Sequence, residues 1–320
     1  MQTGRRHFLE LGLKTLSGAL TMATLPLSGQ AFAEGASARG AARSGRFQVG
    51  EFLKFKSYRD SAGLIHSSRD YLPDDWFEAL GLSPVDVIYS SRFLAGTGLG
   101  ATLDADRLQQ LARAVPSNRL VALDAEEWDA SRSRPDSPLA NGKSIVQNLV
   151  DVVQTFKRAN PAALVGLYSE VPQNTYGFTA TTPAVYDELN PHYAPVAAAV
   201  DYYSPSLYNY RFDGTPAGDA QWARAAAYAV HACRLLDGLN RTRKPVLPYV
   251  TPAWKDTGNV ARYLTEDQMR FRLQTLRQLG ASGCILWLSS SAKEPGGDAP
   301  LVLDPTTGWL RAAVEFAKEP

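Results

Sequence analysis

The sequence predicts an α/β fold, specifically a TIM-like and distorted (β/α) barrel with seven strands. Seven apolar runs of strand length recur along the chain, and segments with apolar residues at helical spacing lie between them. The first strand run is not followed by the glycine-rich turn that an open dinucleotide-binding sheet requires, which favours a closed barrel. The chain has 320 residues, 45% hydrophobic and 20% charged, which excludes a disordered or fibrous protein.

The predicted strands and helices alternate from the first to the last strand run. The helical segments cover residues 108–115, 145–156 and 271–279. Glycines at 96, 98 and 100 follow the second strand run, but their spacing does not suit a phosphate site, so we expect a flexible loop. The seven strand runs are Phe52–Phe55, Val85–Tyr89, Leu120–Leu123, Leu164–Tyr168, Ala199–Tyr203, Val246–Val250 and Cys284–Leu288.

The first 33 residues resemble a twin-arginine export signal rather than part of the fold. Arg5 and Arg6 precede a weakly apolar run at 11–27, and the small residues at 31 and 33 suit cleavage after Ala33. The run is too polar and too short for a stable membrane anchor. We therefore expect export by the twin-arginine machinery and a periplasmic or secreted protein. The alternative is an amphipathic N-terminal helix.

The remainder of the chain divides into a leader and one domain. Residues 34–46 are rich in Gly, Ala, Ser and Arg without apolar periodicity, which is typical of a flexible leader. Residues 47–320 contain no linker and no repeat, so we expect a single barrel domain that is catalytic and monomeric. Removal of residues 1–33 leaves 30 basic and 31 acidic side chains, a net charge of −1. This balance does not indicate a nucleic-acid partner.

The cysteine and histidine content disfavours a metal site. Two cysteines are too few for a thiolate zinc site of the usual spacing, and His66, His192 and His231 lack metal-ligand spacing. We therefore predict no metal and no cofactor. For Cys233 and Cys284, a disulfide and two buried free thiols both remain open.

The ends of the predicted strands carry aromatic and hydroxyl groups, and one end carries a cluster of carboxylates. In a (β/α) barrel the chemistry lies at the carboxyl ends of the strands. Aromatic rings stack on sugar faces and carboxylates can break a glycosidic bond, so the pattern predicts a polysaccharide or oligosaccharide substrate. The ends in question are residues 89–91, 124–128, 168–170, 204–208, 249–254 and 287–290.

The third strand run gives the sharpest prediction. Side chains alternate along a strand, so Asp124 and Glu126 share one face with Ala122, and we expect that face to point into the barrel. Two carboxylates about 6.5–7 Å apart repel each other. One of them therefore retains its proton more readily, as a general acid requires. For Glu127 and Asp129 we expect structural roles, as an exposed glutamate and a cap of the following helix.

These strand ends resemble, in order, motifs of the hyaluronidase family of glycoside hydrolases. The resemblance covers residues 85–290, and it implies a distorted seven-strand barrel. Asp124–Trp128 is similar to the family's Asp-x-Glu-x-Trp motif. The other matching segments are Ile88–Ser91, Gly166–Tyr168, Ser204–Tyr208 and Ile285–Ser290.

The resemblance also implies roles for individual residues. Glu126 would protonate the leaving oxygen and then activate water, while Asp124 would orient a substrate 2-acetamido group. That group's carbonyl oxygen would attack the anomeric carbon, giving a retaining, substrate-assisted mechanism. Tyr168 and Tyr208 would hold the acetamido group and the distorted sugar. Trp287 would form the apolar wall of the same subsite.

Further candidates leave alternatives open. Tyr89, Trp128 and Tyr249 are candidates for substrate contact, although Tyr89 and Trp128 suit a core position equally well. Glu170 follows the fourth strand run, so a conventional glycosidase that pairs Glu126 with Glu170 is one alternative. A barrel that binds polysaccharide without cleaving it is another.

The chain also departs from the family's motifs. Ala125 replaces a bulky aromatic residue, Leu288 replaces a glycine, and the loop at 172–176 lacks a cysteine. The identity of the polymer is therefore left open, a secreted exopolysaccharide included.

Overall fold

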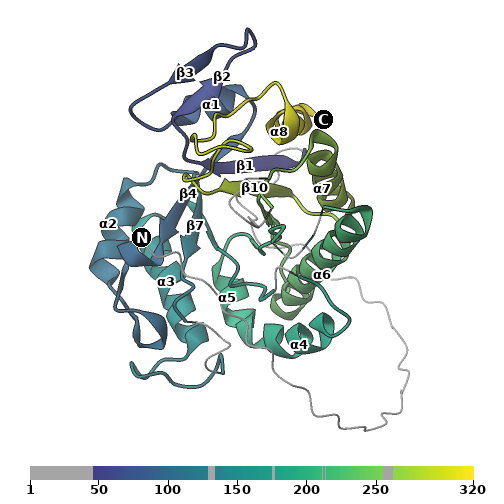
Figure 1. Ribbon diagram of the computed structural model, residues 1–320. Helices are drawn as coiled ribbons and strands as arrows, with labels where there is room; N and C mark the ends of the chain where they lie inside the picture. The colour runs from purple at the N-terminus through teal and green to yellow at the C-terminus, as the bar shows by residue number, and fades with distance from the viewer. Residues whose placement is uncertain (1–45, 129–133, 175–176, 211, 213, 255–261) are drawn as a thin grey trace. The chain divides into compact units, whose positions relative to one another are not determined.

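A curled parallel sheet surrounded by helices forms the centre of the computed structural model (Figure 1). The structure describes residues 46–128, 134–174, 177–210, 212, 214–254 and 262–320. The predicted export signal and leader, apart from Arg46, lie outside the described residues.

Six parallel strands make up the sheet, in the order β8-β7-β4-β1-β10-β9. The register places Gly50 opposite Ser83, Tyr89 opposite Asp124, and Ala122 opposite Gly166. Parallel pairing throughout brings all the carboxyl strand ends to one edge, as predicted for a (β/α) barrel. The strands are β1 Gln48–Leu53, β4 Ser83–Tyr89, β7 Leu120–Asp124, β8 Leu164–Leu167, β9 Tyr249–Val250 and β10 Gly283–Leu288.

The segment 203–206 closes the gap between β8 and β9, and it does so without forming a regular strand. Parallel bridges join Tyr203 to Val246, Ser204 to Tyr168, and Ser206 to Tyr249. Pro205 has no N–H to donate, so a continuous ladder cannot form through this segment. The result is a distorted barrel, which confirms the predicted fold class.

The predicted boundaries of three strand runs are wrong. The run at 199–203 is not a strand, because residues up to Ala199 belong to helix α5 and the bridging begins only at Tyr203. The run at 246–250 shortens to two residues, because Pro248 lacks the N–H that a ladder needs. The first run begins at Gln48 and ends at Leu53 rather than Phe55.

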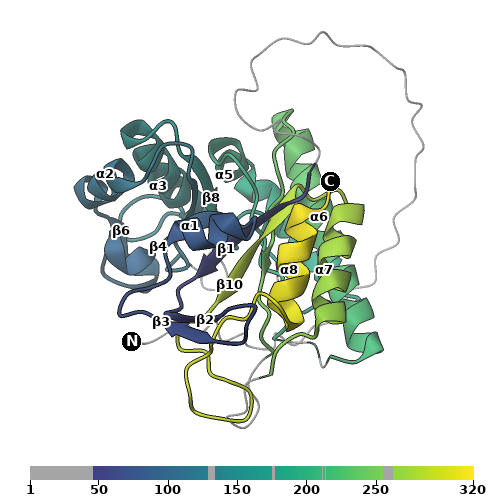
Figure 2. The ribbon, with the colours of Figure 1, turned by 90° about the horizontal axis from the view of Figure 1, so that it is seen from above.

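Helices cover the outside of the sheet. The predicted segments at 108–115, 145–156 and 271–279 correspond to α2, α3 and α7. Capping boxes start α3 at Ser144 and α7 at Thr265, since each side chain accepts a hydrogen bond from the third residue of its helix. Figure 2 shows α7 and α8 side by side along β10. The helices are α1 Asp74–Ala79, α2 Ala105–Ala114, α3 Ile145–Ala159, α4 Thr182–Leu189, α5 Ala194–Ala199, α6 Pro216–Asn240, α7 Glu266–Gln278 and α8 Gly308–Lys318.

Several short elements connect the main strands and helices. Two antiparallel pairs join β2 Ser57–Arg59 to β3 Ile65–Ser67, and β5 Leu94–Ala95 to β6 Thr102–Leu103. Single 3₁₀ turns cover Ser90–Arg92, Gly98–Gly100 and Asn190–Tyr193. Among the helices of the described ranges, none combines the length and apolar character needed to cross a bilayer.

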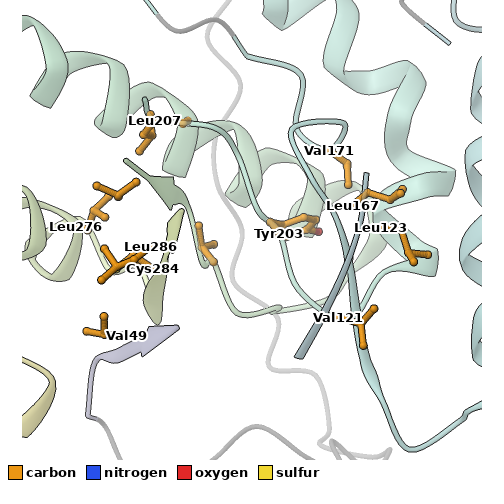
Figure 3. Close-up of a cluster of buried hydrophobic side chains, with 14 of the residues drawn as sticks. Val49, Val121, Leu123, Leu167, Val171, Tyr203, Leu207, Leu276, Cys284 and Leu286 are labelled. Atoms are coloured by element: carbon orange, nitrogen blue, oxygen red, sulfur yellow. The ribbon is translucent and has the colours of Figure 1, made fainter. Parts of the chain in front are cut away.

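Two hydrophobic cores lie on the opposite faces of the sheet. Val121 and Leu123 of β7, and Ala125 just after it, join the outer core between sheet and helices, part of which is drawn in Figure 3. Leu120 and Ala122 of the same strand join the inner core inside the barrel. The strand therefore alternates between the two cores with a period of two residues.

Both cysteines are buried and free. Cys233 lies on α6 and Cys284 on β10, and both belong to the outer core. Burial raises the pKa of both thiols above the ordinary value. The structure thus contains two buried thiols rather than the disulfide that the sequence left open.

Close packing inside the barrel requires a glycine at position 166. A Cβ atom there would lie 2.5 Å from a ring carbon of Tyr202, closer than real Cβ contacts. The Tyr202 hydroxyl donates a hydrogen bond of 2.9 Å to the Val121 carbonyl, so the ring is held across the barrel interior. Tyr202 is 1% exposed and has no free space into which to move.

We predict that Gly166→Ala lowers the free energy of unfolding by about 1–3 kcal/mol, because the added methyl group overpacks the interior. Urea unfolding of the purified domain measures the change. Gly100→Ala is the matched control, because a Cβ there meets nothing within 4 Å. Equal stabilities for the two variants would contradict the packing argument.

Glu51 is a buried carboxyl group on the outer face of β1. It is 1% exposed, and its Oε2 accepts a hydrogen bond of 2.8 Å from the Leu53 backbone N–H. Burial raises the pKa of Glu51 to about 7, although the Leu53 hydrogen bond and the positive charges of Lys54 and Arg119 lower it. The folded protein therefore holds this proton more strongly than the unfolded chain does.

We predict that Glu51 makes the protein less stable as the pH rises from about 4.5 to about 7. Over this interval the Glu51 carboxyl ionises readily in the unfolded chain but not in the folded protein, which favours unfolding. Up to about 3 kcal/mol of stability is therefore lost. Urea unfolding at a series of pH values, for the wild type and for Glu51→Gln, isolates this contribution. Parallel stability profiles for the two proteins would show that Glu51 has an ordinary pKa.

Candidate active site

Two carboxylates mark the carboxyl end of β7. Asp124 is the last residue of the strand and Glu126 follows two residues later; both are half-buried. Ala125 between them is fully buried in the outer core. The Oε1 atom of Glu126 is itself buried.

Asp124 lies within electrostatic reach of two tyrosines on other strands. Burial raises the pKa of Tyr89, and the negative charge of Asp124 raises it further. Burial likewise raises the pKa of Tyr249, to which Tyr202 and Asp124 add. Tyr89 ends β4 and Tyr249 begins β9, so the barrel brings opposite parts of the ring to this carboxylate.

Five aromatic side chains form an aromatic wall: Tyr89 at the end of β4, Tyr168 after β8, Tyr208 after the segment 203–206, Tyr249 in β9 and Trp287 in β10. The Tyr208 ring stacks on Trp287 with centroids 5.4 Å apart and an interplanar angle of 22°. Tyr168 lies 5.9 Å from Tyr208 and meets Tyr249 edge to face at 4.8 Å. The Trp287 indole donates a 3.4 Å hydrogen bond to the Tyr89 hydroxyl. The aromatic wall is therefore continuous around part of the mouth.

Two phenol groups of the aromatic wall, those of Tyr168 and Tyr208, take part in hydrogen bonds with each other and with the segment 203–206. Tyr168 and Tyr208 share a hydrogen bond, and the Tyr168 hydroxyl lies 3.2 Å from Ser206 Oγ. Burial, followed by the neighbouring phenols, raises the pKa of Tyr208 well above its ordinary value. The Tyr208 hydroxyl therefore stays protonated, and its proton is donated to Tyr168.

Tyr89 and Trp128 have different environments, which the sequence did not distinguish. Tyr89 is 38% exposed at the mouth. Trp128 is fully buried in the outer core, and its indole N–H donates a 3.1 Å hydrogen bond to the Ala101 carbonyl. The structure therefore places Tyr89 where a ligand can reach it and Trp128 among the packing residues.

Glu127 anchors a loop, and its predicted role as an exposed glutamate is wrong. It is half-buried, and its Oε2 accepts a 2.6 Å hydrogen bond from the Gly98 backbone N–H. The Ser90 hydroxyl donates to Oε1 at 3.4 Å. Glu127 thus ties the glycine-rich loop at 96–100 to the end of β7. Asp129 lies outside the described residues.

Glu170 belongs to a buried polar layer behind the strand ends. It is 1% exposed, and the Gln173 side chain donates to its Oε2 at 2.9 Å and to its backbone carbonyl at 2.8 Å. In the same layer, the Asn174 side chain donates to the Ser206 carbonyl at 2.5 Å. These contacts hold the loop after β8 against the segment 203–206. Glu170 is more deeply buried than Glu126, which is half-buried.

Sequence reasoning missed two aromatic residues that extend the aromatic wall. Phe52 lies 6.2 Å from Tyr89 and Tyr210 lies 5.3 Å from Tyr208, and both pack against the inner core. Each follows an inward-facing residue by two positions, Phe52 after Gly50 and Tyr210 after Tyr208. Period-two counting beyond the predicted strand boundaries could have found them.

Within the ranges that the structure describes, no group of three or more His, Cys, Asp and Glu side chains is arranged to hold a metal ion. His66 instead has its Nε2 in a 2.7 Å hydrogen bond with Asp60 Oδ2, and its ring stacks on Tyr58.

Comparison with known proteins shows a shared fold. No family model and no curated protein matches the chain. A crystal structure of bee venom hyaluronidase is similar with a TM-score of 0.56 at 17% identity, covering 77% of this chain and 92% of that one. The same enzyme in complex with a hyaluronic acid tetramer gives 0.46 at 17% identity, with coverage of 78% and 80%. A family 51 alpha-L-arabinofuranosidase from Bifidobacterium longum gives 0.44 at 12% identity, with coverage of 82% and 59%. Of these three, only the first has a TM-score above 0.5, and at 17% identity it shows that this chain shares the fold of that structure.

Proposed function

We propose that the protein is a glycoside hydrolase that cleaves a polysaccharide containing 2-acetamido sugars, with retention of configuration. One observation supports the proposal: Asp124 and Glu126 lie two residues apart at the end of β7, where the charge of Asp124 acts on Tyr89 and Tyr249 of the aromatic wall. A pair of carboxylates beside stacked aromatic rings supplies both parts of glycosidase chemistry, proton transfer and sugar binding.

Glu126 is the general acid and base in this proposal. In the first step it donates its proton to the glycosidic oxygen while the substrate's acetamido oxygen attacks the anomeric carbon. Asp124 remains ionised and accepts a hydrogen bond from the acetamido N–H. This contact orients the acetamido group and stabilises the positive charge of the cyclic intermediate. In the second step Glu126 takes a proton from water, which attacks the anomeric carbon and restores the acetamido group.

The aromatic wall binds the sugar in this proposal. The stacked pair of Tyr208 and Trp287 offers an apolar surface for the acetamido methyl group, and the hydroxyls of Tyr168 and Tyr208 are hydrogen-bond partners for the sugar. Tyr249 lies beneath them, edge to face with Tyr168. Tyr89, at the exposed end of the aromatic wall, would contact a neighbouring sugar.

The contacts of Glu170 argue against the conventional two-carboxylate mechanism. A carboxylate nucleophile must reach the anomeric carbon, and Glu170 is instead 1% exposed and hydrogen-bonded to Gln173. A substrate-assisted mechanism needs no second nucleophile from the protein, which suits the geometry around Asp124 and Glu126.

We predict that Glu126→Gln lowers turnover by about 10²–10⁴-fold, because the amide can neither donate the proton nor activate water. Reducing-end release from a panel of polysaccharides measures it, with the chain from Glu34 onward. Asp124→Asn should show a comparable loss on polymers with acetamido groups. Glu188→Gln, an exposed glutamate on α4, is the control and should retain activity.

Two outcomes would contradict the proposal. Equal turnover by the wild type and Glu126→Gln would remove Glu126 from the chemistry. Binding of a polymer by both proteins without any product would instead identify a barrel that binds polysaccharide and does not cleave it.

We also propose that the protein acts outside the cytoplasm, on the basis of Arg5, Arg6 and the cleavage sequence ending at Ala33. Replacing both arginines by lysine should leave the full-length precursor in the cytoplasm, as cell fractionation and immunoblotting would show. The same replacement at Arg39 and Arg43 is the matched control. Export of the Arg5→Lys/Arg6→Lys variant at the control level would refute the twin-arginine assignment.

A further inference from the structure

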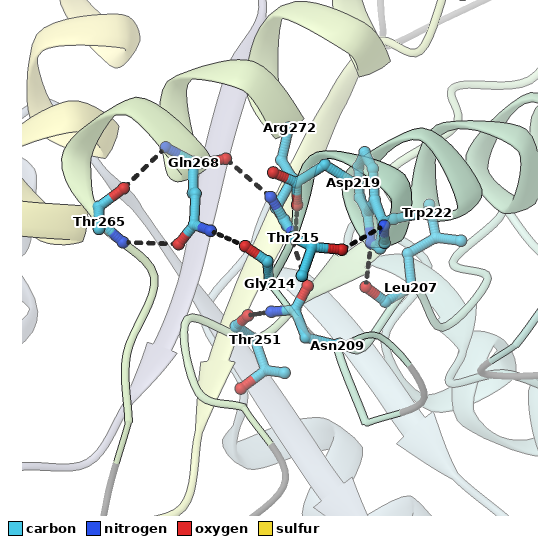
Figure 4. Close-up of polar contacts among 11 residues, drawn as sticks. Leu207, Asn209, Gly214, Thr215, Asp219, Trp222, Thr251, Thr265, Gln268 and Arg272 are labelled. Atoms are coloured by element: carbon cyan, nitrogen blue, oxygen red, sulfur yellow. Dashed lines mark hydrogen bonds and ion pairs between the residues drawn. The ribbon is translucent and has the colours of Figure 1, made fainter.

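A fully buried arginine lies behind the aromatic wall. Arg272 projects from α7 and is 0% exposed, and its guanidinium lies 5.1 Å from the Trp222 ring centroid (Figure 4). The Trp254 ring centroid is 5.3 Å from the guanidinium. Burial lowers the pKa of Arg272, and the nearby charge of Asp219 opposes that effect. A buried guanidinium is retained only where its donors are satisfied.

The donors of Arg272 reach three different segments. Nε donates to the Asn209 side-chain oxygen at 2.9 Å, Nη2 to an Asp219 carboxylate oxygen at 2.9 Å, and Nη1 to the Gln268 carbonyl at 3.0 Å. Asp219 lies in the first turn of α6 and Gln268 in that of α7, so the arginine joins the two helix starts. Helix starts in this fold lie at the same end as the carboxyl strand ends.

The bond to Asn209 links this network to the aromatic wall. Asn209 is 0% exposed and lies between Tyr208 and Tyr210 in the chain. Its side-chain N–H donates a 2.6 Å hydrogen bond to the Thr251 carbonyl, two residues after Tyr249 (Figure 4). Arg272 and Asn209 therefore connect two neighbouring strand ends from behind, while the tyrosines face the mouth.

The helix caps reinforce the same connection. The Gln268 side chain, which caps α7 with Thr265, also donates to the Gly214 carbonyl at 3.0 Å. Trp222 donates its indole N–H to the Leu207 carbonyl at 3.0 Å. The backbone on both sides of Tyr208 is thus held by side chains of α6 and α7.

We propose that Arg272 is a positioning residue, which through Asn209 fixes Tyr208 and Tyr210 in the sugar-binding mouth. The inference rests on the proposed function for its effect on catalysis. A fixed Tyr208 keeps its stacked partner Trp287 and its hydroxyl in one place, so less reorganisation is needed when the sugar is bound. Arg272 itself does not touch the substrate.

A double-mutant cycle with Arg272→Lys and Asn209→Ala tests the proposal. Lysine keeps the charge but lacks the planar fork that reaches Asn209, Asp219 and Gln268 together. We expect each single variant to lower kcat/KM by roughly 10- to 100-fold. We expect the double variant to be no worse than Asn209→Ala alone, because both changes break the same connection. Losses that multiply in the double variant would overturn the proposal.

Asp219→Asn separates positioning from stability. It breaks the ion pair with Arg272 and leaves the bond to Asn209 in place, so it should lower Tm about as much as Arg272→Lys while kcat/KM stays within about threefold. If Arg272→Lys has a lower Tm but the same kcat/KM as Asp219→Asn, the role of Arg272 is merely structural. That result would overturn the proposal.

Hydrogen exchange of the backbone amides at 207–210 gives a readout that does not depend on catalysis. Faster exchange in Arg272→Lys than in Asp219→Asn supports the positioning role, and equal exchange overturns it. Absence of hydrolysis by the wild type with every polymer would instead overturn the proposed function. The two failures are therefore distinguishable.

Discussion

The closure of the barrel by the segment 203–206 is the constraint on which the mouth depends. The N–H groups of Leu247 and Tyr249 donate to the carbonyls of Tyr203 and Pro205 at 2.8 and 2.9 Å, and Ser169 donates to Ser204 at 3.1 Å. These few bonds replace a complete ladder between β8 and β9. They bring the aromatic residues that follow three successive parts of the ring into contact with one another. Without them Tyr168, Tyr208 and Tyr249 would belong to separate edges of an open sheet.

The closure of the barrel also limits which side chains can fill its interior. A closed ring of short strands leaves little room, and Tyr202 occupies it by crossing over Gly166 to reach the Val121 carbonyl. Small inward residues, Ala122 and Gly166, lie opposite each other in register and make space for this ring. The packed floor excludes water below the mouth and supports the tyrosines above it.

Charged groups behind the mouth hold the strand ends rather than the ligand. Glu127 binds the backbone of the loop at 96–100, Glu170 binds Gln173 after β8, and Arg272 binds Asn209 beside Tyr208. Glu127 and Glu170 each lie within two residues of a candidate site residue. Arg272 is hydrogen-bonded to Asn209, which is next to one. Irregular loops at strand ends have few backbone partners of their own, so buried side chains supply the hydrogen bonds that order them.

The fold class and the alternation of the β7 residues could be predicted from the amino-acid sequence. Period-two alternation and apolar runs are local properties, so Val121 and Ala122 could be assigned to opposite faces without knowledge of their neighbours. The surroundings of each polar and aromatic candidate depend on segments far apart in the chain, so they could not be predicted in this way. Trp128 proved to be core, Glu127 a loop anchor, and the run at 199–203 no strand. No sequence pattern around Arg272 predicted its role. Its partners Asn209 and Asp219 are more than 50 residues away, and only the folded ring brings them together.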